Sequence, residues 1–178
     1  MKTHRLLIGV GVVLALAAVL AGGCQRKGRA GEYYSKAHKY SIIPPASWVK
    51  KPGNNIMDVM FSCPDGLRSA DAHENINVVT ETLPQAMSLE DYTRAAIATM
   101  EAVIKDYQQV SLTDFELGNT QGKRLVSTFA VGDKKAQSVT YFAARDTTAF
   151  VFSGTATPDS FSKFEATFDE CARTFRVE

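Results

Sequence analysis

The polar cluster with the clearest chemical potential lies between residues 64 and 75, in the stretch PDGLRSADAHEN. Asp71, His73 and Glu74 are nearly adjacent there, and Asp65 precedes them in the same turn-rich segment. An imidazole and several carboxylates are ligands that zinc or manganese accepts. Their spacing matches no known metal signature, and adjacent polar residues in a turn are usually solvated. The cluster makes a metal-dependent enzyme one of two functional hypotheses.

Other recognisable catalytic patterns are missing from the sequence. Only His38 and His73 follow the N-terminal leader that is described below. The sequence has no nucleophile elbow, phosphate-binding glycine loop, paired-histidine zinc motif or Cys-x-x-Cys pair. We therefore expect a protein that is not an enzyme and carries no cofactor. The net charge of +1 gives no electrostatic footprint for nucleic acid.

Two of the three cysteines, Cys63 and Cys171, form a possible pair. Each falls on the predicted inward face of its element, where a buried thiol is common. In an oxidising compartment they could form a disulfide, provided that their Cα atoms lie within ~7 Å of each other. The sequence leaves two alternatives open, a disulfide between Cys63 and Cys171 or two separate buried thiols.

The first 23 residues have the order of parts found in a secretory signal peptide. Lys2 and Arg5 give a basic start, and residues 6–21 contain no polar side chain before two glycines and Cys24. This run is short for a transmembrane helix, which needs ~20 apolar residues. The glycines also weaken the last helical turn that a span would need. An uncleaved membrane anchor is the alternative interpretation.

The stretch LAGGC that ends this leader resembles a bacterial lipobox. In that family a diacylglycerol is attached to the cysteine, and the peptide is cut just before it. The resemblance implies cleavage after Gly23 and lipidation of Cys24, although Ala21 stands where the pattern prefers leucine. Because Gln25 is not aspartate, the resemblance favours the outer membrane, facing the periplasm, over retention at the inner membrane. Several acyl chains would anchor the protein stably.

The chain therefore divides into three segments, with a signal peptide over residues 1–23, a tether over 24–36 and a single domain over 37–178. The tether has no apolar period, and its basic residues Arg26, Lys27 and Arg29 would be attracted to anionic headgroups. Without Lys2 and Arg5 the remaining chain carries a net charge of −1. A domain of about 140 residues buries enough surface for one core.

Alternating apolar residues predict a series of strands in the domain. They are expected in the stretches YSII, NIMDVMFSC, INVVTETL, YQQVSLTDFEL, KRLVSTFAV, SVTYFAA and AFVFSGTA. Pro44 and Pro45 end the first strand, because proline cannot donate to a sheet ladder. In the second, the residues on one face are Met57, Val59, Phe61 and Cys63, and in KRLVSTFAV they are Leu125, Phe129 and Val131. Glycine and charged residues at 132–135 predict a hairpin turn.

Two helices are expected beside these strands. Ser88 and Asp91 form a capping-box pattern at the start of the first helix, which should end near Asp106. Its apolar face comprises Leu89, Tyr92, Ala96, Met100, Val103 and Tyr107. Pro158 and Asp159 begin the second, whose stripe comprises Phe161, Phe164, Phe168, Cys171 and Phe175. The order of elements predicts an α+β fold, an antiparallel sheet of about six to eight strands flanked by helices.

The motif YSIIPPASW, together with this order of strands and helices, resembles the PsbP/DcrB group of the Mog/PsbP-like superfamily. Its specific part is Tyr40–Ile42 followed by Pro44 or Pro45 and then Trp48, and the order of elements covers nearly all of residues 33–177. The resemblance implies an antiparallel sheet flanked by helices, and binding or assembly more than catalysis. Trp48 itself is either a plug at the edge of the core or an exposed recognition residue.

Two functional hypotheses follow. In the first, the chain is a lipid-anchored protein of the cell envelope that acts as a non-catalytic binding or assembly module. Its partners would be the membrane, through the anchor at Cys24, and an envelope protein whose identity the sequence does not give. In the second, it is a metal-dependent envelope enzyme that uses Asp71, His73 and Glu74. A carrier of small ligands has no sequence feature in its support.

Overall fold

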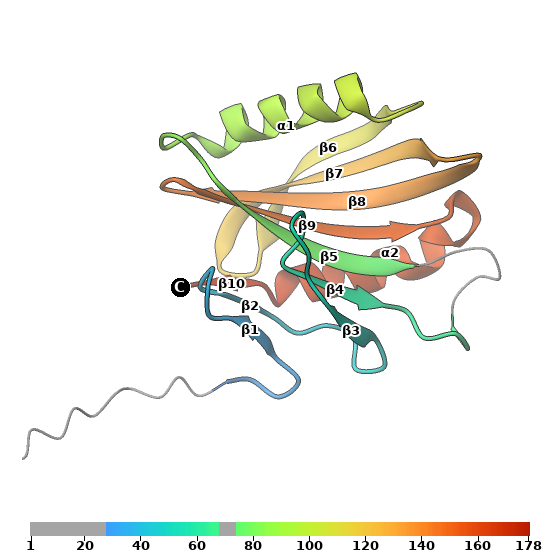
Figure 1. Ribbon diagram of the computed structural model, residues 1–178, viewed down its shortest axis with the longest axis horizontal. Coiled ribbons are helices and arrows are strands. Elements are labelled where there is room, and N and C mark those ends of the chain that lie inside the picture. Colours follow the sequence, from blue (N-terminus) through green and yellow to red (C-terminus); the bar gives the residue numbers. More distant parts are fainter. Residues whose placement is uncertain (1–27, 68–73) are drawn as a thin grey trace, which may run out of the picture.

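The computed structural model describes residues 28–67 and 74–178. A seven-stranded antiparallel sheet in the order β3-β4-β5-β9-β8-β7-β6 forms the body of the domain, and helices α1 and α2 lie on opposite faces of it (Figure 1). A three-stranded sheet in the order β1-β2-β10 lies on the α2 side. The predicted class, an antiparallel α+β fold, is confirmed.

In the described residues, five strands precede α1, four strands lie between α1 and α2, and one strand follows α2. The elements are β1 (Tyr33–Ser35), β2 (Tyr40–Ile42), β3 (Val49–Pro52), β4 (Val59–Ser62), β5 (Asn75–Thr82), α1 (Leu89–Val103), β6 (Gln108–Leu117), β7 (Thr120–Val131), β8 (Lys134–Arg145), β9 (Thr148–Ala156), α2 (Pro158–Arg173) and β10 (Arg176–Val177). Strand β1 lies inside the segment that the sequence assigns to the tether, so residues 33–35 of that segment belong to the small sheet.

Helix α1 starts where the capping box predicts. The Ser88 hydroxyl accepts a hydrogen bond from the Asp91 amide at 3.0 Å and donates one to the Asp91 carboxylate at 2.7 Å. The helix ends at Val103 rather than near Asp106, because Ile104 is extended and Asp106 has a φ of 54° that turns the chain into β6. Val103 is consequently 74% exposed, and its predicted place on the buried face is wrong.

Helix α2 packs its predicted stripe against the other face of the sheet. Phe161, Phe168 and Cys171 are buried, and Phe164 is partly buried beside them. The ring of Phe168 lies directly over Gly154 of β9, where an added Cβ would come within 2.4 Å of the ring carbons. A glycine at this point of the strand therefore allows the helix to approach the sheet closely.

The small sheet joins the two ends of the described chain. Strand β2 pairs with β1 on one side and with β10 on the other. Asn119, in the β6–β7 turn, holds β10 through both of its amide atoms, accepting from the Val177 N–H and donating to the Val177 carbonyl, each at 3.1 Å. Neither α1 nor α2, the helices of the described part, has the length and hydropathy that crossing a bilayer requires.

Candidate functional site

Two adjoining hollows, of about 470 and 560 Å³, share Pro45 and Trp48 on the α2 side of the molecule. We call them together the Trp48 groove. Its first half is lined by Pro45, Ser47, Trp48, Leu67, Lys163, Phe164 and Thr167, and its second by Ala30, Gly31, Glu32, Tyr33, Ile43, Pro44, Pro45, Ala46, Trp48, Lys50 and Phe61. The lining is mostly apolar and aromatic, which is typical of binding sites.

The proline turn between β2 and β3 places Trp48 between the two halves. Its backbone N–H donates to the carbonyl of Pro45 at 2.9 Å, closing the turn that the two prolines begin. The indole is 9% exposed and lies edge-to-face on Phe164 and Phe168, with centroid distances of 6.1 and 6.2 Å. Trp48 is therefore a plug at the edge of the core, and its outer surface still contributes to the groove.

The rim of the groove is cationic. Lys50 and Lys163 are both exposed, and the Lys50 ammonium lies 5.5 Å above the Tyr33 ring. The acidic residue of the lining, Glu32, is held by Arg29, whose Nε lies 2.7 Å from the carboxylate. Leu67 adds an exposed aliphatic side chain at 61% exposure. The groove thus suits a ligand with apolar and anionic parts.

The sequence pointed to only part of this groove. Pro44, Pro45 and Trp48 form a recognisable local motif, whereas Leu67 and Lys163 come from segments far away in the sequence. The packing of α2 on the sheet brings Lys163 beside Trp48, and the turn that follows β4 brings Leu67 there. No local spacing could have identified them.

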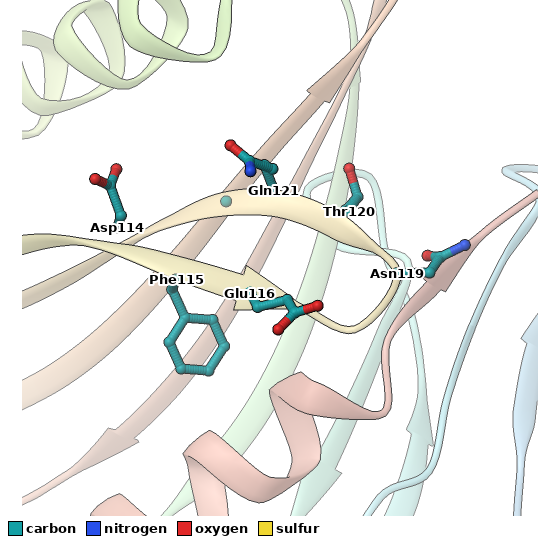
Figure 2. Close-up of a pocket in the computed structure, with 7 residues that line it drawn as sticks. Asp114, Phe115, Glu116, Asn119, Thr120 and Gln121 are labelled. Atoms are coloured by element: carbon teal, nitrogen blue, oxygen red, sulfur yellow. The ribbon is translucent and has the colours of Figure 1, made fainter.

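A second hollow, at the β6–β7 hairpin, does not form a convergent site. Figure 2 shows Asp114 and the adjacent Phe115 of β6 pointing to opposite sides of the hairpin. This divergence follows from the alternation of side chains along a strand. Groups on opposite faces cannot act on one ligand, so we do not assign a function to this hollow.

An ionic cluster holds α2 to the sheet beside that hairpin. Arg124 of β7 donates to Glu165 at 2.6 Å and to Asp169 at 2.8 Å, and the Tyr141 hydroxyl donates to Asp169. Burial lowers the pKa of Arg124, but the hydrogen bonds that it donates to the two carboxylates, together with the negative charge of Asp169, raise the pKa overall. Burial also raises the pKa of Tyr141. All four groups are paired with one another, so the cluster is structural.

The predicted metal residues are only partly within the described chain. Asp71 and His73 lie outside the described residues. Glu74 is 1% exposed, and the Ser160 hydroxyl at the start of α2 donates to its carboxylate at 2.9 Å. A carboxylate at a helix N-terminus is favourable, so Glu74 has a structural role. Among residues 28–67 and 74–178, no three His, Cys, Asp or Glu side chains are close enough to hold a metal ion.

The cysteines, too, lie partly within and partly outside the described residues. Cys24 lies outside the described residues. Cys63 and Cys171 are buried, and no disulfide joins them in the structure. The Cys171 thiol donates to the carbonyl of Ile43 at 3.3 Å, and burial raises its pKa to about 12.

Several solved structures are similar to this fold. Cyanobacterial PsbP (CyanoP) from Synechocystis matches with a TM-score of 0.64 and 19% identity over 89% of this chain and 99% of its own. LpqN of Mycobacterium tuberculosis, a protein involved in cell envelope biogenesis, matches with a TM-score of 0.62 and 10% identity over 76% and 81%. PA94 of Pseudomonas aeruginosa, of unknown function, matches with a TM-score of 0.61 and 14% identity over 83% and 97%. These similarities establish a PsbP-like fold.

No curated protein matches the sequence. The family described as DcrB, however, matches residues 66–174, which is more than half of the chain. The matched range begins between β4 and β5, runs through both helices and stops just before β10. It therefore includes most of the large sheet, and the chain belongs to the DcrB family.

Proposed function

We propose that this protein is lipid-anchored in the bacterial cell envelope, at the outer membrane and facing the periplasm. There it acts as a non-catalytic binding or assembly module, and the Trp48 groove is its binding surface. The observation that carries this proposal is the groove itself. It combines an apolar floor with the cationic rim of Lys50 and Lys163.

Two further facts support the anchor and the location. The sequence LAGGC at residues 20–24 resembles a lipobox, and a basic stretch follows it. The structurally similar LpqN is involved in cell envelope biogenesis. A protein partner in the envelope, expected from the sequence, stays a prediction.

The anchor is tested by the intact mass of the protein extracted from its own membranes. We expect a chain that begins at Cys24 and carries the additional mass of acyl groups. Cys24→Ser should accumulate as an unprocessed form or leave the membrane fraction. A wild-type protein that retains residues 1–23 without acylation would contradict this part of the proposal, and the segment would then be a plain membrane anchor.

The binding surface is tested by placing a photo-crosslinking amino acid at Leu67 in intact cells. Leu67 lines the groove and is exposed, so its replacement should not disturb the core. We expect a discrete covalent adduct, with either a lipid or a protein of the envelope. The matched control is the same amino acid at Val110 of β6, which is 59% exposed but outside the groove. Equal labelling at both positions, or none at Leu67, would contradict the proposal.

A further inference from the structure

We propose that the Trp48 groove contacts the anionic surface of the membrane leaflet that holds the lipid anchor, so that the domain sits on that leaflet in one orientation. This inference rests on the proposed lipidation of Cys24. It adds the chemical identity of what the groove meets, namely the phosphate-bearing headgroups of anionic phospholipids. It also identifies the side of the molecule that faces the membrane.

The first argument is the length of chain between the anchor and the groove. Only residues 25–27 separate Cys24 from Gly28, the first described residue. Even a fully extended chain covers at most about 14 Å between the Cα atoms of residues 24 and 28. Ala30, Gly31 and Glu32, which follow immediately, form one wall of the groove. The anchor therefore confines the groove to the neighbourhood of the headgroups.

The second argument is the positive charge on the rim of the groove. Lys50 and Lys163 are exposed on the rim, whereas the carboxylate of Glu32 is 3% exposed and paired with Arg29. Electrostatic attraction extends over a Debye length of about 10 Å at 0.1 M salt, comparable to the reach of the tether. Basic groups held so close to an anionic leaflet are attracted to it.

The third argument is the apolar character between the two lysines. The proline turn with Pro44 and Pro45, the edge of the Trp48 ring and the exposed Leu67 line the same two hollows as the lysines. Tryptophan and lysine side chains favour the interfacial zone, where an apolar body meets charged headgroups. The exposed apolar area is small, so the contact is with the headgroup layer rather than with the hydrocarbon core.

The experiment uses the chain's single tryptophan as the reporter, because Trp48 is part of the proposed contact. The full acylated protein is reconstituted into phosphatidylcholine vesicles with or without phosphatidylglycerol. Both kinds of vesicle include a phospholipid that carries a nitroxide quencher on its headgroup. We expect quenching of Trp48 fluorescence that is strong with phosphatidylglycerol, weak without it, and reduced by added salt.

The charge argument is tested by Lys50→Glu combined with Lys163→Glu. This variant keeps the anchor and the tether, but we expect it to lower the ratio of docked to undocked protein at least about tenfold. The control, Lys105→Glu with Arg145→Glu, changes two exposed basic residues that lie outside the groove, one after α1 and one at the end of β8. It should dock as the wild type does. Circular dichroism verifies that both variants are folded.

Several results would overturn this inference. Equal quenching in the groove variant and the control would mean that the tether alone sets the distance. An acylated protein without quenching, or a Leu67 crosslink to a protein instead of a lipid, would leave the proposed binding module intact but not its contact with the leaflet. A mass that retains residues 1–23 would instead contradict the anchor, and this inference with it.

Discussion

At the scale of single residues, the burial of Cys171 makes the stability of the folded protein depend on pH. Its thiol lies against the Ile43 carbonyl, and burial raises its pKa from 9.0 to about 12. The folded protein therefore holds this proton more tightly than the unfolded chain does. The resulting stabilisation is complete below about pH 9 and is lost as the pH rises toward 12.

We accordingly predict that the free energy of unfolding of the wild type decreases as the pH rises from 9 to 12. These limits are the ordinary pKa of a thiol and the raised pKa of Cys171 in the folded protein. In Cys171→Ala this decline should be shallower by up to about 1.4 kcal/mol per pH unit. Urea denaturation at successive pH values measures both slopes, and comparing slopes removes the constant cost of the substitution. Identical slopes for the two proteins would show that Cys171 does not titrate in this way.

At the scale of elements, β7 presents two neighbouring cations to opposite faces of the sheet. Arg124 faces α2 and is paired with Glu165 and Asp169, with 15% of its side chain exposed. Lys123 faces α1 and is paired with Glu90 and Asp114, which are 67% and 90% exposed. The two cations are similarly buried, since Lys123 is 19% exposed, and the sites differ in their carboxylates, which are 41% and 21% exposed beside Arg124.

Arg124→Leu should therefore lower the free energy of unfolding by about 1–3 kcal/mol, because it leaves partly buried carboxylates without their cation. Lys123→Leu is the matched control, and we expect little change, since ion pairs with well-exposed partners contribute little. Equilibrium unfolding in urea measures both. If the two substitutions lower the free energy of unfolding equally, the Arg124 cluster does not stabilise the packing of α2 on the sheet.

The elements also show what the sequence could and could not predict. The periods of β4 and α2 identified buried residues correctly, because each period is a local property of its element. Strands β1, β3 and β10 were missed, because they are two to four residues long and exist through partners elsewhere in the chain. Val103 was wrongly placed on the apolar face of the first helix, since the apolar period continued to the end of α1, where its side chain is exposed.

The sequence likewise indicated some residues of the candidate site and not others. Pro45 and Trp48 belong to one short motif, so the sequence drew attention to them. Lys163 and Leu67 reach the groove because α2 and the turn that follows β4 lie beside that motif. A surface assembled from three distant segments has no spacing of its own in the sequence.

At the scale of the whole molecule, the small sheet and the large sheet share one core. Tyr40 of β2 is fully buried, with its ring stacked on Phe175 at 5.2 Å and edge-to-face on Phe150 of β9 at 6.1 Å. Phe150 and Phe175 also contact each other, at 5.7 Å. These three rings connect β2, the large sheet and the segment between α2 and β10. Because both sheets depend on the same contacts, we expect them to unfold together.

Tyr40→Ala should lower the free energy of unfolding of the entire domain by about 3–5 kcal/mol, as the loss of a large buried ring does elsewhere. Tyr40→Phe retains the ring and is the control, with a much smaller loss. Far-UV circular dichroism follows the strands during urea denaturation, while Trp48 fluorescence follows the α2 side. In one cooperative unit the two signals share a single midpoint, which Tyr40→Ala shifts for both. Separate midpoints would show instead that the small sheet and the region around Trp48 unfold independently of the large sheet.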